Sequence, residues 1–206
     1  MLNEFDQKAG DWDKNPIHTE RSGAIADAML QRLPIEGSMK ALEYGAGTGL
    51  LSFLLKDRFA EITLMDSSTE MIRIVREKID QLQALHLKPV LINLEKEEFP
   101  GIFDMIYSQM VFHHVENLPA LLLKFSRMLC ADGFLVVADL YPEDGSFHGE
   151  GFTGYKGFNP EWLAGLLHDS GFDRIQHQLC YTIRKKDAAD AMKEFPVFLM
   201  TAQKSF

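Results

Sequence analysis

Short apolar segments alternate with amphipathic segments along most of this chain. The apolar segments predict strands at residues 39–44, 61–65, 89–93, 103–108 and 134–138. Between strands, apolar residues recur at helical spacing, as at Met71, Val75 and Ile79. This β-α-β-α order predicts a parallel sheet that helices cover on both faces.

Local signals mark the helix ends. A helix is predicted over residues 20–33, and Ser67 to Glu70 has the spacing of a capping box before another. Further predicted caps and stops are Asn117, which begins a helix running to about residue 129, Asn159-Pro160, and Gly171. These signals agree with the alternation of strands and helices.

The C-terminal part follows a different pattern. Apolar and polar residues alternate from Ile175 to Ile183, as in a half-exposed strand near a sheet edge, and residues 195–201 predict a last strand. The connection between them includes residues 187–192 and is short for a crossover, so this pair is expected to be antiparallel. The predicted fold is α/β: a doubly wound, mostly parallel seven-stranded sheet with an antiparallel strand near the C-terminal end. Residues 1–206 are expected to form one domain.

Composition excludes several classes of protein. The chain carries 21 Lys+Arg against 30 Asp+Glu, a net charge of −9, which argues against a nucleic-acid partner. No apolar run approaches the roughly 18 residues of a membrane span. The N-terminus lacks a basic and apolar leader, and the two cysteines, Cys130 and Cys180, form no motif. A cytoplasmic protein is expected.

Ligands of such sheets bind beyond the carboxyl ends of the strands, where a glycine loop follows the first strand here. Gly45, Gly47 and Gly49 permit a tight turn and close approach of a ligand, although glycines at such a turn can also be purely geometric. The loop lacks the lysine of a phosphate loop, and its third glycine comes one residue early for a dinucleotide loop.

Two carboxylates favour a particular ligand. Glu43, just before the loop, would repel a pyrophosphate but suits an ammonium group; the alternative is a strand-end residue facing solvent. Asp66 ends the second strand, where it can bind a ribose diol or simply favour a helix N-terminus. S-adenosylmethionine has a ribose, an ammonium and a sulfonium group and no phosphate, so it fits both residues.

These motifs resemble the class I S-adenosylmethionine-dependent methyltransferases, closest to the small-molecule branch that includes quinone-biosynthesis enzymes. The resemblance rests on an ordered set of motifs: Glu43-x-Gly45-x-Gly47-x-Gly49, Asp66 to Met71, Phe103 to Ser108, Val111 to Val115 and Asp132-Gly133. A segment near the N-terminus, Phe5-Asp6 and Ala9 to Asp13 with Trp12, resembles the family's amphipathic lid, so residues 1–35 are expected to form an N-terminal helical lid segment.

The resemblance implies roles for particular residues. The glycine loop with Glu43, Ala46 and Thr48 would surround the methionine part of the cofactor, and Asp66 would hold its ribose. Residues expected near the adenine are Ser67, Met71, Asn93, Leu94 and Glu95, and those beside the sulfonium are Ser108, Gln109 and Met110. Asn93 departs from the family's Asp, but its amide can still accept from the adenine amino group.

Residues 139–158 are expected to be a substrate loop, because glycines alternate there with aromatic residues. His148 or Tyr155 would act as the base, whereas the alternative is a loop whose aromatic residues merely pack. His113 and His114 are adjacent, so they point about 100° apart in a helix, and no third ligand is evident. No metal site is expected.

The predicted function is methyl transfer from S-adenosylmethionine to a small molecule by in-line displacement, with S-adenosylhomocysteine as product. Two alternatives stay open: a cofactor-binding regulatory or partner subunit without turnover, and a nicotinamide-dependent oxidoreductase. A protein or nucleic-acid methyltransferase is less favoured, because the chain has no Asn-Pro-Pro-Tyr motif. A small-molecule substrate, no membrane span and a monomer or homodimer are expected.

Overall fold

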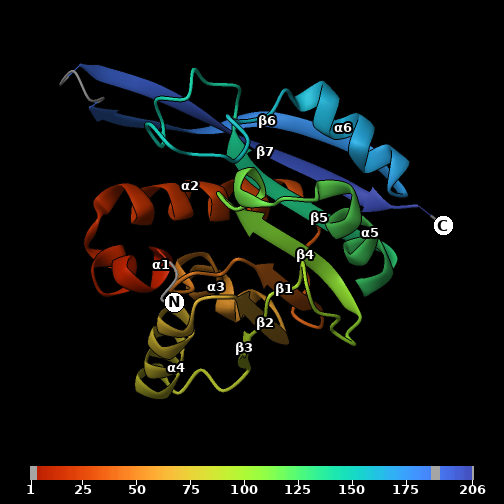
Figure 1. Cartoon of the computed structure of the whole chain (residues 1–206). Coiled ribbons are helices and arrows are strands. Elements are labelled where there is room, and N and C mark those ends of the chain that lie inside the picture. The colour runs from red at the N-terminus through yellow and green to blue at the C-terminus, as the bar shows by residue number, and fades with distance from the viewer. Residues whose placement is uncertain (1–3, 187–190, 206) are drawn as a thin grey trace.

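A single seven-stranded sheet organises the chain, with strand order β3-β2-β1-β4-β5-β7-β6 (Figure 1). The computed structural model describes residues 4–186 and 191–205. Residues 1–3 and 206 of the predicted domain, and 187–190 of the predicted C-terminal connection, lie outside the described residues. The first five strands are β1 (Lys40–Tyr44), β2 (Glu61–Asp66), β3 (Leu87–Leu91), β4 (Phe103–Gln109) and β5 (Leu129–Leu140).

The strand pairing confirms the predicted fold. Strands β1 to β5 pair in parallel, whereas β7 (Met192–Lys204) runs antiparallel to both β5 and β6 (Phe172–Lys186). The order reverses around β1, which lies between β2 and β4. In open α/β sheets this reversal creates a crevice at the carboxyl ends of the strands.

Helices cover both faces of the sheet (Figure 1). On one face lie α2 (Pro16–Arg32), α3 (Leu50–Leu55) and α4 (Thr69–Leu82), and on the other lie α5 (Leu118–Met128) and α6 (Pro160–Asp169). The short helices are α1 (Glu4–Lys8) and the 3-10 helices η1 (Ala9–Lys14), η2 (Lys56–Arg58) and η3 (Phe112–His114). Among the described residues, none of these helices has both the length and the apolar character needed to cross a bilayer.

The core forms two apolar layers because successive strand residues point to opposite faces. Met29 of α2, Leu51 of α3 and Val75 of α4 pack on one face. Phe125 of α5 and Leu163 of α6 pack on the other. The sheet therefore lies between the two layers, which pack against its strands from both faces.

Several element ends differ from the sequence prediction, and β5, β6 and β7 each extend beyond their predicted ranges. Helix α2 begins at Pro16 rather than at residue 20, because Asn15 caps it with a side chain that accepts from the Ile17 N–H. Strand β3 spans residues 87–91 rather than 89–93, in register with β2. The cap of α4 is Ser68, which accepts from the Met71 N–H, and not Ser67.

Candidate functional site

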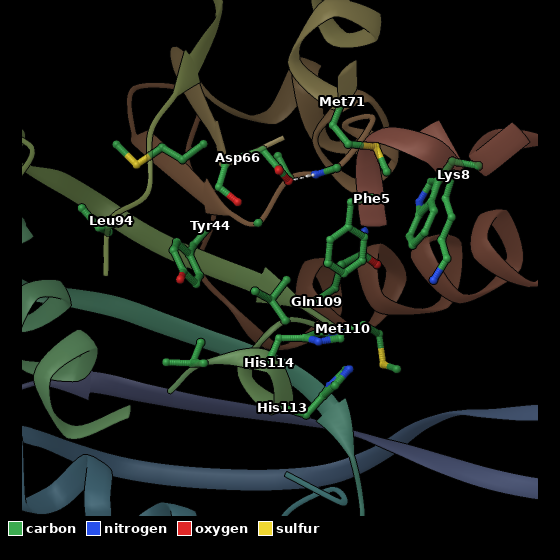
Figure 2. A pocket seen from close by; sticks show the side chains of 18 of the residues that line it. Phe5, Lys8, Tyr44, Asp66, Met71, Leu94, Gln109, Met110, His113 and His114 are labelled. Carbon is green, nitrogen blue, oxygen red and sulfur yellow. Dashed lines mark hydrogen bonds between the residues drawn. The ribbon is translucent and has the colours of Figure 1, made fainter. Parts of the chain in front are cut away.

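A pocket lies at the carboxyl ends of the strands on either side of the order reversal (Figure 2). From β1, β2 and the segments that follow them it is lined by Tyr44, Gly45, Ala46 and Gly47, and by Met65, Asp66, Ser67 and Met71. After β3 and β4 it is lined by Ile92 to Glu95, Gln109 to Val111 and His113 to Val115. The N-terminal helices add Phe5, Lys8, Trp12, His18 and Arg21, and the loop after β5 adds Phe147 and His148.

The first part of the glycine loop, residues 45–47, lines this pocket. Gly45, Gly47 and Gly49 have φ values of 67°, 55° and 80°, a region that disfavours residues with a Cβ. A Cβ on Gly45 would lie 2.4 Å from the Val111 side chain, whereas one on Gly47 would have only ordinary contacts. The loop therefore needs its first glycine for packing as well as for backbone conformation.

Asp66 bridges the glycine loop and the start of α4. One carboxylate oxygen accepts from the Gly47 N–H at 2.7 Å and the other from the Ser68 N–H at 2.8 Å. Burial raises the pKa of Asp66, an effect that these backbone donors oppose. The side chain lies at the pocket wall between the loop and Met71 (Figure 2).

Glu43 is fully buried and does not line the pocket. Its position in β1 points it toward α3, where one carboxylate oxygen accepts from the Ser52 hydroxyl and N–H. The other oxygen has no hydrogen-bond partner in the described part of the chain. Burial raises the pKa of Glu43 to about 8, which the hydrogen bonds from Ser52 partly offset.

The N-terminal helices fold over the glycine loop. Phe5 and Trp12 pack edge to face with ring centres 6.2 Å apart, and the Trp12 ring lies 4.2 Å from that of His18. Asp13 accepts from the Thr48 hydroxyl and pairs with Lys78 of α4. These contacts hold the segment of the predicted lid against one side of the pocket.

Arg21 is the buried cation of the pocket wall. Its side chain on α2 is 5% exposed, and its Nε has no hydrogen-bond partner among the residues that the structure describes. Burial lowers the pKa of Arg21 to about 10, while the negative charge of Asp139 opposes this change. The guanidinium therefore stays charged at neutral pH.

Histidines form the opposite wall of the pocket, beside Gln109 and Met110 (Figure 2). His113 is buried, and its Nδ1 lies 2.6 Å from a carboxylate oxygen of Asp139. His114 follows it on η3, and His148 reaches the same wall from the loop after β5.

Most of the predicted site residues come together in this pocket. Those that line it are Gly45, Ala46, Gly47, Asp66, Ser67, Met71, Asn93, Leu94, Glu95, Gln109, Met110 and His148. Those that do not line it are Glu43, Thr48, Gly49, Ser108 and Tyr155. Tyr155 instead borders a neighbouring hollow and packs its ring on Phe158 and Trp162.

Other residues that line the pocket had no individual site role in the sequence prediction: Lys8, His18, Arg21, Tyr44, Met65, Ile92, Val111 and Val115. Arg21 belongs to no sequence motif, since it is a charged residue among other polar residues of the predicted helix. Phe147 also lines the pocket. The composition of residues 139–158 predicted a substrate loop, but it did not distinguish Phe147 from the other aromatic residues there.

Comparisons with known proteins agree with this fold and site. Residues 17–195 match a family model described as a methyltransferase domain. Malonyl-[acyl-carrier protein] O-methyltransferase from Laribacter hongkongensis is 29% identical over 178 residues, which cover 81% of this chain and 59% of that protein. The chain thus spans less than two thirds of the length of this relative.

Two solved structures share the fold. The YcgJ protein from Bacillus subtilis has a TM-score of 0.75 at 15% identity, covering 89% of this chain and 99% of that one. Phosphoethanolamine N-methyltransferase 2 from Haemonchus contortus, in complex with S-adenosyl-L-methionine, has a TM-score of 0.71 at 15% identity, covering 100% of this chain and 61% of that one. With the family model matching most of its residues, the chain belongs to the class I S-adenosylmethionine-dependent methyltransferase family.

Proposed function

We propose that this chain transfers the methyl group of S-adenosylmethionine to a small-molecule acceptor by in-line displacement. The observation that carries the proposal is the pocket itself, which joins the glycine loop and Asp66 at one end to a histidine and aromatic wall at the other. By its name, the relative described above methylates an oxygen of a malonyl group carried by a protein, which supports a small acyl group as acceptor.

The polar groups of the pocket fit the cofactor. The Asp66 carboxylate suits the ribose diol, and Asn93 with the Leu94 backbone suits the adenine edge. Arg21, a buried guanidinium whose Nε lacks a partner among the described residues, suits the carboxylate of the methionine part. When bound, the cofactor supplies a methyl group activated by a sulfonium sulfur.

The role of the chain in the reaction is mainly to position the reactants. Phe5 and Trp12 cover the cofactor end and exclude water, while Phe147 and His148 border the acceptor end. An acceptor that must lose a proton would meet an imidazole at this wall, in keeping with the role expected of His148. Tyr155 lies outside the pocket, so its predicted role as a base has no geometric support.

Calorimetric titration of the full chain with S-adenosylhomocysteine tests the cofactor part. Micromolar binding is expected, and Asp66→Ala should weaken it by about 100-fold, since two hydrogen bonds to a charged acceptor are lost. Asp57→Ala is the matched control, because its side chain is 77% exposed on η2 and lies outside the pocket. Absence of binding by the unaltered chain would overturn the proposal.

Turnover separates the proposal from its alternatives. Formation of S-adenosylhomocysteine with a panel of small hydroxyl, amine and carboxyl acceptors is expected. Binding without turnover on any acceptor would favour a partner subunit. Tight binding of NADH in place of S-adenosylhomocysteine would favour an oxidoreductase.

A further inference from the structure

Three histidine side chains converge at the acceptor end of the pocket, although two come from η3 and one from the loop after β5. The ring centres of His113 and His114 are 4.3 Å apart, and that of His148 lies 4.9 Å and 5.1 Å from them. One nitrogen of each ring lies within 4.8 Å of the corresponding nitrogens of the other two. All three residues line the pocket.

This spacing is close to that of three imidazoles on one metal ion. At a Zn–N distance of about 2.1 Å and tetrahedral angles, imidazole centres lie roughly 5 Å apart and ligand nitrogens roughly 3.4 Å apart. The observed ring centres, 4.3–5.1 Å apart, are near this spacing, and side-chain rotations would bring the nitrogens, now within 4.8 Å of one another, to ligand distance. His148 is the exposed member of the cluster, and its ring stacks on that of Phe152 with centres 3.9 Å apart, so it would turn by sliding along this neighbour.

A buried carboxylate orients the first of these rings. Asp139 accepts from the Nδ1 of His113 at 2.6 Å and also from the backbone N–H of Leu140 at 2.7 Å. With Nδ1 bound to Asp139, the Nε2 of His113 is the nitrogen left to bind a metal. Metal-binding histidines in proteins usually have this second hydrogen bond, which fixes the tautomer and makes the ring more basic.

The loop that carries His148 is held in place at both ends. Glu143 accepts from the N–H groups of Gly145 and Phe147 at 2.7 Å and 3.1 Å. Beyond the histidine, Tyr155 donates its N–H to the carbonyl oxygen of His113 at 2.8 Å. The loop therefore places His148 opposite η3 by specific contacts rather than by length alone.

We infer that His113, His114 and His148 bind a divalent transition-metal ion, with Zn²⁺ as the ion that three imidazoles and an open fourth position suit best. The fourth position faces the pocket, because all three ligands line it. Sequence reasoning did not expect a metal because the adjacent pair lacked a third ligand; the tertiary structure supplies His148.

The inference also gives the metal a role in the proposed methyl transfer, and that role rests on the proposed function. A hydroxyl of the acceptor bound at the fourth position would lose its proton to solvent at a lower pH than in water. Its oxygen would then form the bond to the methyl carbon while the carbon–sulfur bond breaks and its electron pair stays on sulfur. An imidazole bound to the metal accepts no proton, so the metal would replace the base expected at His148.

Titration of the metal-free, untagged chain of 206 residues with Zn²⁺ and Co²⁺ tests the site. One Zn²⁺ per chain is expected, and Co²⁺ should give the intense visible absorption of a tetrahedral complex. His148→Ala and His114→Ala should each weaken binding by more than about 100-fold, beyond the 10–100-fold that losing an outer hydrogen-bond partner costs. His168→Ala is the matched control, since that side chain is 73% exposed on α6.

The outcomes separate this inference from the proposed function. Weak Co²⁺ binding that is unchanged in His148→Ala would overturn the metal site and leave the histidines as packed rings. S-adenosylhomocysteine binding by the same metal-free chain would in that case leave the proposed function intact. Tight Zn²⁺ binding without cofactor binding would support the metal site and overturn the proposed function. Circular dichroism of each variant shows whether it is folded.

Discussion

Glu43 is a buried acid whose environment favours its neutral form. The unfolded chain releases this proton near pH 4.5, whereas the folded protein keeps it until about pH 8. Between these values the folded state binds more protons than the unfolded state, so the free energy of unfolding falls as the pH rises. Burial of one carboxyl group therefore makes the protein less stable at alkaline pH.

Glu43→Gln should flatten this dependence, because glutamine has nearly the shape of the protonated acid and does not titrate. The free energy of unfolding of the unaltered chain should lose about 1 kcal/mol more per pH unit than that of the variant. Urea denaturation of both at several pH values between 4.5 and 8 checks this. Equal slopes would show that Glu43 is ionised in the folded protein.

Substitutions at two glycines of the loop should distinguish an effect on cofactor binding from an effect on folding. Gly47→Ala should cost about 1 kcal/mol of stability through its positive φ, and the protein should still fold because the new Cβ meets nothing closer than 3.8 Å. The methyl group should nevertheless weaken S-adenosylhomocysteine binding by 10-fold or more. Gly45→Ala should destabilise further, because its Cβ would collide with Val111.

Gly165→Ala provides the control for these two variants. Gly165 lies within α6, and a Cβ there has nothing within 4 Å. This substitution should raise stability by about 0.5–1 kcal/mol and leave cofactor binding unchanged. Thermal unfolding and calorimetry of the three variants together check the ranking. Unweakened binding by Gly47→Ala would mean that the ligand does not approach the loop.

At the scale of elements, a tryptophan in the N-terminal helices should make ligand binding in the pocket visible by fluorescence. Trp12 lines it, whereas the other tryptophan, Trp162, lies on α6. S-adenosylhomocysteine should therefore change the fluorescence of Trp12 alone. Trp12→Phe should abolish the change and Trp162→Phe should preserve it, in a fluorescence titration. A signal that survives Trp12→Phe would show that this segment does not cover the ligand.

Element types were predictable from the sequence, whereas some element ends were not. Asn117 and Asn159 cap α5 and α6 as expected, because capping depends on residues within one turn. The first turn of α2, residues 16–19, was missed because His18 and Thr19 are polar and Arg21 interrupts the apolar spacing that Ile25 and Met29 continue. The Asn15-Pro16 pair was the available signal for that start. Strand β3 depends on its register with β2, which local pattern does not contain.

At the scale of the whole molecule, cofactor binding should stabilise the fold. A ligand present at 100 times its dissociation constant adds about 2.7 kcal/mol to the free energy of unfolding. For a chain of 206 residues this corresponds to a rise in Tm of roughly 5–10 °C. Differential scanning fluorimetry with S-adenosylhomocysteine checks the shift, which Asp66→Ala should reduce to about 1 °C at the same ligand concentration. An equal shift in that variant would place the ligand elsewhere.

The sequence by itself determined the sheet, the glycine loop and the position of Asp66, because alternation, turn chemistry and strand ends are local properties. The tertiary structure alone decided which face each side chain takes: Glu43 points toward Ser52 and away from the pocket, although its spacing suited a ligand. It also brought Arg21 and His148 to the site from distant segments. These contacts depend on how helices and loops pack over the strand ends. Packing brings together residues that are far apart along the chain, and no periodic pattern in the sequence marks such pairs.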